Sequence, residues 1–193
     1  MGKGVIHNLP YHQTRMQRSR RELFQTSTMI DLQSHITPPD KTDLYRCRIL
    51  YREQIESIEY LPYKPRTIKR LKIVPSDIQY TYKYADRSEL NALLENHSEA
   101  DEVLIEKDGL LTDTTIANIA LLQNGQWYTP LHPLLEGTMR AQLIDKGILQ
   151  LREIATREIE DYTHLALMNA MIGFNIYKIY SLDLGLNTLK IGY

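Results

Sequence analysis

Hydrophobic and polar residues alternate with a period of two along three segments in the first half of the chain: 42–49, 55–60 and 67–74. This period is typical of strands with one polar face, and it predicts an antiparallel sheet. Ahead of these segments, residues 5–9 favour a short strand, and Pro10 can begin a helix that runs to about Phe24. Proline suits the first helical turn because its missing N–H would have no helical partner there.

Turn signals dominate the second half of the chain. Hydrophobic runs at 103–106 and 116–122 end in Asp108-Gly109 and Asn124-Gly125, respectively. Both dipeptides tolerate positive φ, so they predict hairpins with type I′ turns. The pattern also predicts strands at 127–129 and 165–171, a short terminal segment after the second of these, and helices at 87–94 and 139–145.

These elements predict an α+β protein with two parts that meet at a cleft. We expect a small N-terminal domain over residues 1–76 and a larger C-terminal domain over residues 77–193. The clearest breaks in the pattern are the Pro38-Pro39 pair and the turn cluster around Pro62 and Pro65.

Composition narrows the range of partners. The 193 residues include 23 basic and 24 acidic ones, for a net charge of -1. This balance gives no general electrostatic reason to expect nucleic acid or an anionic membrane, and a small-molecule ligand becomes the default. The longest apolar stretch, 165–174, is far shorter than the roughly 20 residues of a membrane span.

Cysteine and histidine usage limits the chemistry further. Cys47 is the single cysteine, so an internal disulfide and a CxxC motif are excluded, which fits a reducing compartment. No secretory signal is recognised, and we expect a cytoplasmic protein. No cluster of histidine and cysteine suggests a metal site.

Lys83 is the first candidate for chemistry, because Tyr80, Tyr82 and Tyr84 flank it at the end of an apparent strand. A lysine amine among aromatic rings is expected to be partly desolvated, which lowers its pKa and favours the neutral amine that attacks an aldehyde. On this feature alone, a surface lysine extending past tyrosine rings is the more common explanation.

Several segments resemble, in the right order, the class IV aminotransferases, which are pyridoxal phosphate enzymes of fold type IV. The matching segments span about residues 4–172: HQTR at 12–15 for HxxR, KYADR at 83–87 for KxxxR, ADEVLI at 100–105 with GLLTD at 109–113 and Asn118 for ADExL...GxxTE....N, YTP at 128–130, GTMR at 137–140 for GIMR, and MNAM at 168–171 for CNAL.

The resemblance assigns roles to residues that could hold pyridoxal 5'-phosphate. Lys83 matches the Schiff-base lysine, and Arg15 matches the arginine that binds the cofactor phosphate. Thr138 and Met139 lie at a predicted helix start, where backbone N–H groups attract the same phosphate. Asp113 stands where the family has a glutamate that pairs with the pyridine nitrogen, and it is one methylene shorter.

The resemblance extends to the substrate side of the site. Asn169 falls in the late segment that implies a substrate contact, whereas His12 is expected to pack and to form hydrogen bonds rather than to catalyse. The fold implied is the two-domain D-amino-acid aminotransferase type with a shortened N-terminal domain, because only Met1, Gly2 and Lys3 precede the first matching segment. Family members are typically homodimers, so a homodimer is expected.

Within the family, the GTMR segment and the Asn169-Ala170 pair look most like 4-amino-4-deoxychorismate lyase, which releases pyruvate and 4-aminobenzoate in folate synthesis. One site of this kind can support either lyase or aminotransferase chemistry. A branched-chain or D-amino-acid aminotransferase therefore remains an alternative. The shortened amino end also leaves open a non-catalytic remnant that binds the cofactor, and a binding domain without a cofactor requires every motif match to be accidental.

Overall fold

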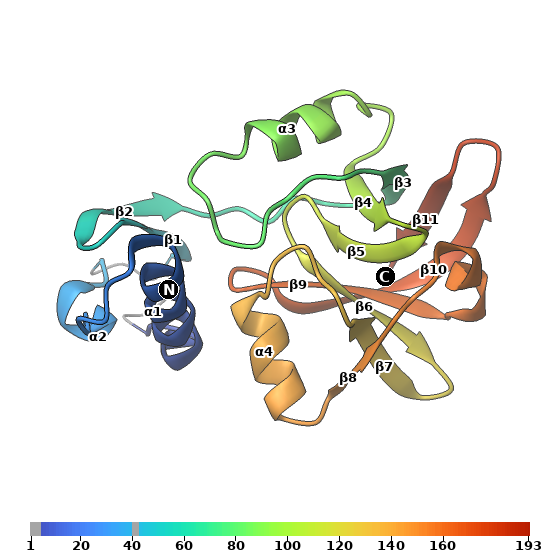
Figure 1. Cartoon of the computed structure of the whole chain (residues 1–193). Helices are drawn as coiled ribbons and strands as arrows, with labels where there is room; N and C mark the ends of the chain where they lie inside the picture. The colour runs from blue at the N-terminus through green and yellow to red at the C-terminus, as the bar shows by residue number, and fades with distance from the viewer. Residues whose placement is uncertain (1–4, 40–42) are drawn as a thin grey trace. The chain divides into compact units, whose positions relative to one another are not determined.

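The computed structural model describes residues 5–39 and 43–193. The chain divides into two compact units, Met1–Pro65 and Arg66–Tyr193 (Figure 1). The boundary expected from the sequence falls at residue 76 instead. Strand β3 (Arg70–Pro75) lies between these two positions, and it pairs with strands β4 and β11 of the second unit.

The first unit combines two helices with one hairpin. Helix α1 (Leu9–Phe24) is followed by the short helix α2 (Leu32–His35), and β1 (Tyr45–Tyr51) pairs antiparallel with β2 (Ile55–Pro62). Met16 of α1 packs in one cluster with Ile30, Leu32 and Ile36. The predicted helix is confirmed, with Pro10 in its first turn.

Arg20 fixes α1 within the first unit. Its side chain is fully buried, and the guanidinium donates hydrogen bonds to the backbone carbonyls of Thr28 and Glu53. Arg20 therefore ties the helix to the segment that follows it and to the turn between β1 and β2. An apolar side chain at this position could not donate hydrogen bonds to these carbonyls, whereas the guanidinium has several N–H donors.

Two predictions for the first half are wrong. Residues 6–8 form no strand, because a turn there leads directly into α1 at Leu9. The three alternating segments do not form one sheet either: only β1 and β2 pair with each other, whereas β3 enters the sheet of the second unit. A period of two shows that a strand has two different faces, but it does not name the neighbouring strand. Thr42, where the first of these strands was expected to begin, lies outside the described residues.

The second unit is built on one nine-stranded sheet in the order β5-β4-β3-β11-β10-β9-β6-β7-β8. Because β5 also pairs with β6, the strands from β5 to β6 close on themselves, and β7 and β8 extend beyond the closure. The remaining strands are β4 (Glu102–Lys107), β5 (Leu110–Thr114), β6 (Asn118–Gln123), β7 (Gln126–Pro130), β8 (Leu149–Arg152), β9 (His164–Asn169), β10 (Gly173–Asp183) and β11 (Thr188–Gly192).

Helices cover parts of this sheet. Helix α3 (Ser88–Glu95) packs against β4, and α4 (Thr138–Asp145) packs against β8 and β9. A short 3-10 helix, η1 (Thr156–Asp161), follows β8. The predicted helices at 87–94 and 139–145 are thus confirmed within one residue at each end.

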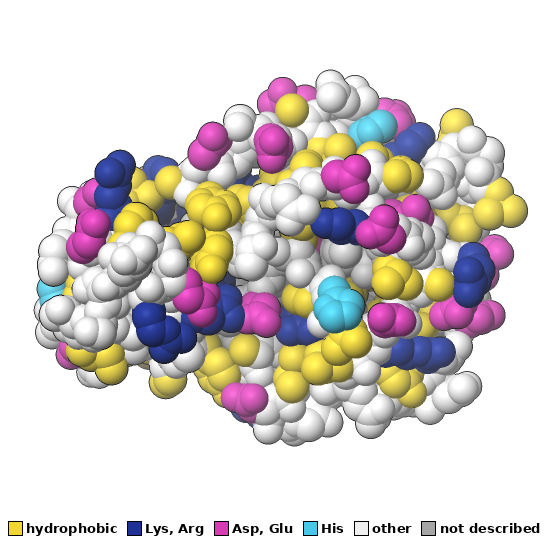
Figure 2. Space-filling model, viewed as in Figure 1, with side chains coloured by type: hydrophobic (Ala, Val, Ile, Leu, Met, Phe, Trp, Pro, Cys, Tyr) yellow, Lys and Arg dark blue, Asp and Glu magenta, His cyan; other side chains and the backbone are white. Residues whose placement is uncertain are grey.

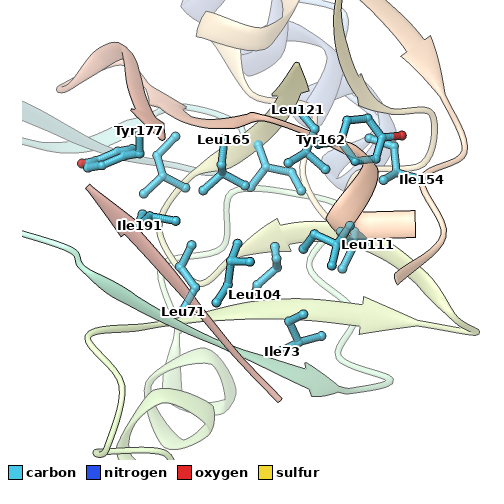
Figure 3. Close-up of a cluster of buried hydrophobic side chains, with 14 of the residues drawn as sticks. Leu71, Ile73, Leu104, Leu111, Leu121, Ile154, Tyr162, Leu165, Tyr177 and Ile191 are labelled. Atoms are coloured by element: carbon cyan, nitrogen blue, oxygen red, sulfur yellow. The ribbon is translucent and has the colours of Figure 1, made fainter. Parts of the chain in front are cut away.

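The main core of the second unit consists of apolar side chains from most of its strands. Leu71, Leu104, Leu121 and Leu165 are fully buried in this cluster, and Tyr162 covers it (Figure 3). Smaller clusters lie under α3 and α4. The closed part of the sheet thereby has an interior packed with apolar side chains.

The hairpin turns agree with the sequence. Asp108-Gly109 and Asn124-Gly125 have φ values of 53°, 78°, 51° and 78°, as type I′ turns require. The end of the chain differs from the prediction, because β10 and β11 form a long hairpin in place of a short terminal segment. Exposed apolar residues such as Tyr180 and Leu184 obscure the alternation of apolar and polar positions that would have predicted strands there.

Candidate functional site

Lys83 lies in the loop that connects β3 to α3, and its side chain is exposed. The expected strand end is therefore wrong, because β3 ends at Pro75 and Lys83 follows in a loop. A tyrosine ring does lie next to Lys83, as predicted, since the Lys83 Nζ is 5.6 Å from the centre of the Tyr80 ring. Tyr80 is buried, and its hydroxyl donates a 2.7 Å hydrogen bond to the carbonyl of Tyr84. The loop that carries the lysine is thus anchored by a ring beside it.

Arg87 connects this loop to a second segment. Its guanidinium lies 5.8 Å from the Tyr80 ring centre and donates a 2.8 Å hydrogen bond to the carbonyl of Thr115. Thr115 follows β5, two positions after Asp113. The segment of Lys83 is therefore fastened to the segment of Asp113.

Asp113 is a buried carboxylate with defined partners. The Asn118 side-chain amide donates to its Oδ1 at 2.8 Å, and the Leu135 backbone N–H donates to its Oδ2 at 2.8 Å. Burial raises the pKa of Asp113 to about 6, against the opposing effect of these hydrogen bonds and of the Arg140 charge. A cationic group placed at this carboxylate would favour its ionised form.

Asn118 links Asp113 to the start of α4. Its amide nitrogen also donates to the Leu135 carbonyl at 2.7 Å. A Cβ on Gly137 would lie 1.9 Å from the Asn118 Oδ1, so only glycine leaves room for this side chain. Gly137 is the N-cap of α4, and the packing explains a glycine that backbone φ alone does not demand.

The start of α4 has the character of an anion site. The N-cap Gly137 supplies no side-chain hydrogen bond, and the first turn lies at the positive end of the helix dipole, where anions bind favourably. Thr138 is buried there, and Met139 is half-buried. These are the two residues that the sequence assigned to a phosphate.

Arg140 adds a buried cation to the same turn. Its guanidinium donates a 2.7 Å hydrogen bond to the Pro130 carbonyl, and its Nε has no partner within the residues that the structure describes. Burial lowers the pKa of Arg140, whereas the nearby Asp113 and Glu136 charges raise it. The sequence analysis matched Arg140 to a motif without giving it a role.

Asn169 ends β9 and holds the turn into β10. Its Oδ1 accepts hydrogen bonds from the N–H groups of Met171 and Ile172, at 2.8 and 3.0 Å. Its amide nitrogen donates to the Ile116 carbonyl at 3.1 Å. The residue expected to meet the substrate thus has a structural function in the turn, close in the fold to the segment after Asp113.

Arg15 belongs to the first unit, whereas the other predicted site residues belong to the second. It is half-buried on α1 beside His12. Burial and the Arg15 charge lower the pKa of His12 to about 4, so this histidine is neutral at pH 7. A neutral, largely enclosed ring fits the expectation that His12 packs rather than catalyses.

Within the second unit, the contacts join Lys83, Asp113 and the start of α4. Arg87 bridges the lysine loop to Thr115, and Asp113 holds the backbone of Leu135, shortly before α4. Leu134 and Leu135 pack against the cluster that contains Tyr80. These contacts link the loop of Lys83, the buried carboxylate of Asp113 and the start of α4 near the junction of β5 and β6.

A pocket of 390 Å³ lies beside the lysine loop and the first turn of α3, lined mainly by residues 78–80 and 84–90. Neither Asp113 nor Thr138 lines it. We therefore place the candidate site by its contacts and not by this pocket.

Charged side chains of both signs share one face of the molecule. On the face shown in Figure 2, basic and acidic side chains are interspersed and do not form one basic field. Within residues 5–39 and 43–193, no group of three or more His, Cys, Asp or Glu side chains could hold a metal ion. None of the helices among these residues is long and apolar enough to cross a membrane.

Comparison with known proteins identifies the class of protein. Residues 2–178 match the model of the amino-transferase class IV family. The chain belongs to this family of pyridoxal phosphate-dependent enzymes, which confirms the resemblance and the α+β, fold-type IV architecture predicted from the sequence.

Individual relatives are similar over nearly their whole length. An uncharacterized protein of Haemophilus influenzae is 37% identical over 175 residues, which span 88% of this chain and 93% of that protein. The crystal structure of a "putative 4-amino-4-deoxychorismate lyase" from Haemophilus somnus 129PT has a TM-score of 0.79 and 34% identity, and the match covers 89% of this chain and 93% of that one.

A third relative is similar over a shorter stretch. A "putative aminodeoxychorismate lyase" of Schizosaccharomyces pombe is 45% identical over 65 residues, or 28% of each chain. The pyridoxal phosphate-bound form of a "hypothetical aminotransferase" from Mycobacterium tuberculosis shares the fold, with a TM-score of 0.72 at 15% identity, and the match covers 87% of this chain and 74% of that one.

Proposed function

We propose that this enzyme is a pyridoxal phosphate-dependent 4-amino-4-deoxychorismate lyase that releases pyruvate and 4-aminobenzoate for folate synthesis. The observation that carries the proposal is the near full-length likeness, at 34% identity, to a protein named for this activity. The shorter match to the Schizosaccharomyces pombe protein supports the same reaction. The contacts that gather Lys83, Asp113 and α4 in the second unit support the proposed residues.

The residues present fit pyridoxal phosphate. The positive end of the α4 dipole and the buried Arg140 cation suit a phosphate, and the backbone amides of Thr138 and Met139 are proposed to bind it. Arg15 of the first unit is proposed to bind the same phosphate through its guanidinium fork. The buried Asp113 suits the pyridine nitrogen, since a carboxylate there keeps that nitrogen protonated. Lys83, with its exposed amine, is proposed as the residue that attaches to the aldehyde.

When bound, pyridoxal phosphate supplies an electron sink for the bonds at the amine-bearing carbon of the substrate. The chain supplies the positioning and the proton transfers. Asp113 holds the pyridine end, and the first turn of α4 holds the phosphate end. In this arrangement, Lys83 takes the proton from the amine-bearing carbon of the substrate as a general base. The neighbouring ring C–O bond to the enolpyruvyl group would then break, and the released enolpyruvate would take up a proton at carbon to become pyruvate. The ring is left aromatic, which supplies much of the driving force.

Asn169 is proposed to lie at the substrate. Its Oδ1 is engaged by two backbone N–H groups, so a substrate contact would come from the amide nitrogen, which has two N–H groups. One of these already donates to Ile116. The turn from Asn169 to β10 would in that case form part of the substrate wall.

The first experiment tests the cofactor site. Purified protein mixed with pyridoxal phosphate should show the visible absorption band of a lysine-bound cofactor, and Lys83→Ala should abolish it. Lys69→Ala is the matched control, because Lys69 is also exposed in the second unit and should leave the band unchanged. Absence of the band in the parent protein contradicts the proposed cofactor site.

The second experiment identifies the reaction. The loaded enzyme should release pyruvate from aminodeoxychorismate, and Lys83→Ala should not. Amino transfer from a branched-chain or D-amino acid to a keto acid, without pyruvate release from aminodeoxychorismate, would identify an aminotransferase instead. A band with both assays blank would identify a non-catalytic remnant that binds the cofactor.

We also propose that the enzyme acts in the cytoplasm as a homodimer. The single cysteine supports a reducing compartment, and the dimer rests on the family resemblance. Sedimentation of the loaded protein as a monomer at assay concentration would contradict the dimer.

A further inference from the structure

Glu102 is a fully buried carboxylate that binds the turn after Asp113. Its Oε1 accepts a 2.5 Å hydrogen bond from the Thr115 hydroxyl and a 3.2 Å hydrogen bond from the Thr115 N–H. The Val103 N–H donates to the same oxygen at 3.0 Å. The Oε2 accepts from the Arg66 guanidinium at 2.6 Å. Each oxygen of this buried group therefore has a donor, which offsets the cost of removing a carboxylate from water.

Thr115 is held at all three of its polar groups. Glu102 accepts from its N–H and its hydroxyl, and Arg87 donates to its carbonyl at 2.8 Å. Glu102 comes from strand β4, whereas Arg87 comes from the loop that carries Lys83. Thr115 is thus fixed by hydrogen bonds from two different elements.

Thr115 lies close in the sequence to residues of the proposed site, so the hydrogen bonds that hold it affect the geometry of that site. It lies two residues after Asp113, in the segment that joins β5 to β6. The next residue, Ile116, accepts the hydrogen bond from Asn169. A displacement of this segment would therefore move the proposed pyridine partner relative to the lysine loop and to the turn of Asn169.

We propose that Arg87 and Glu102 clamp Thr115 and thereby set Asp113 relative to Lys83, so that both are positioning residues for the site. The inference rests on the proposed cofactor function. Arg87 acts on both sides, because the same guanidinium lies over Tyr80, whose ring is next to Lys83. Glu102 fixes Thr115 against β4. The segment that joins β5 to β6 is therefore held in place even if the loop of Lys83 and Arg87 is displaced.

Variants at three positions test the clamp. Arg87→Met removes the donor to the Thr115 carbonyl, Thr115→Val removes the hydroxyl while it keeps the shape, and Thr115→Ser keeps the hydroxyl. Arg157→Met serves as the control for Arg87→Met, because Arg157 is exposed and lies in η1. Glu102→Gln, with Glu106→Gln of the same strand as its control, tests the charge.

One measurement requires no cofactor. In the cofactor-free protein, carbon-13 NMR should show that Arg87→Met and Thr115→Val move the titration midpoint of the Asp113 carboxyl and speed amide exchange at residues 115–118. Thr115→Ser and the two controls should match the parent. Unchanged titration and exchange in folded Arg87→Met and Thr115→Val would overturn the clamp, whatever the outcome of the cofactor experiments.

A second measurement uses the loaded protein. Arg87→Met and Thr115→Val should weaken pyridoxal phosphate binding about tenfold, the loss expected for one charge-assisted hydrogen bond. They should also shift the pH midpoint of the visible band. A lower unfolding temperature with parent-like affinity and band would mean that the residues only stabilise the fold, and that result also overturns the proposal. Absence of the band in the parent protein counts against the proposed function and leaves the NMR test of the clamp in force.

Discussion

Asp113 and Asn118 stand opposite each other at the one register position where β5 pairs with β6, and the Asn118 amide donates a 2.8 Å hydrogen bond to the Asp113 carboxylate. The residue pair that joins β5 to β6 and closes the sheet therefore also influences the pKa of the carboxylate in the candidate site. The same Asn118 excludes any side chain larger than glycine at position 137, at the start of α4.

Asn118→Ala should raise the pKa of Asp113 further above its present value of about 6, because the variant loses a hydrogen bond that favours the ionised form. A carboxyl whose pKa is raised on folding contributes most to stability below its unfolded value of 3.8, and this contribution is lost as the pH rises through about 6. In the variant this loss should extend to higher pH, which urea denaturation between pH 4 and pH 9 measures.

The same change should affect the cofactor. Pairing with a protonated pyridine nitrogen requires ionised Asp113, so affinity for pyridoxal phosphate should rise with pH through about 6 in the parent and at a higher pH in Asn118→Ala. Spectral titration at several pH values measures this shift. Identical pH profiles for the two proteins would disprove the role given to Asn118.

Gly137→Ala should lower the free energy of unfolding by about 2 kcal/mol, because the new Cβ displaces the Asn118 side chain from a site without spare room. Gly185→Ala is the control, since the nearest atom to its Cβ would lie at 3.5 Å. In the double variant Asn118→Ala/Gly137→Ala, the losses should be less than additive, because the clash is gone. Additive losses would show that another contact is responsible.

Asn169→Ala should lower the free energy of unfolding by about 1–2 kcal/mol through loss of the hydrogen bonds that hold the turn into β10. If Asn169 also contacts the substrate, the Asn169→Ala variant should have a higher KM than the parent protein. Denaturation and steady-state kinetics on the same preparation separate the two effects. A lower stability with an unchanged KM would restrict Asn169 to the turn.

Acid should destabilise the first unit through His12. Its pKa is about 4 in the folded protein, against an ordinary value of 6.5, so the unfolded chain binds a proton more readily. Stability should therefore fall as the pH drops from 6.5 towards 4, by about 1–2 kcal/mol once partial exposure of the residue is allowed for. His12→Gln should reduce this fall, and His132→Gln, at an exposed position, should not. Equal acid sensitivity in the parent and His12→Gln would contradict the prediction.

Local sequence signals predicted much of the fold. The two Gly-containing hairpin turns were recognisable because positive φ demands particular residues, and α3 and α4 followed from helical periodicity. The neighbours of β3 were not predictable in this way, because pairing with β11 joins segments far apart in the sequence. The strand pattern carries no information about so distant a partner.

The site was predicted in part for a related reason. Motif order identified Lys83, Asp113 and the start of α4, and the structure joins their segments by contacts. The roles of Glu102, Asn118 and Arg140 were missed because each depends on a partner that only the fold brings near. A polar residue within an otherwise buried strand was the available signal for Glu102.

The single register pair between β5 and β6 has a consequence for the order in which the protein opens. The neighbouring contacts of β6 with β9 extend over five register pairs, so the seam at Asp113 and Asn118 is the shorter junction. A ligand that binds Asp113 and the first turn of α4 would bridge elements next to this seam. Native-state hydrogen exchange should therefore slow most in β5 and β6 when such a ligand binds. With the ligand absent, this part of the sheet would open by local unfolding, and with the ligand bound it would open only when the whole protein unfolds.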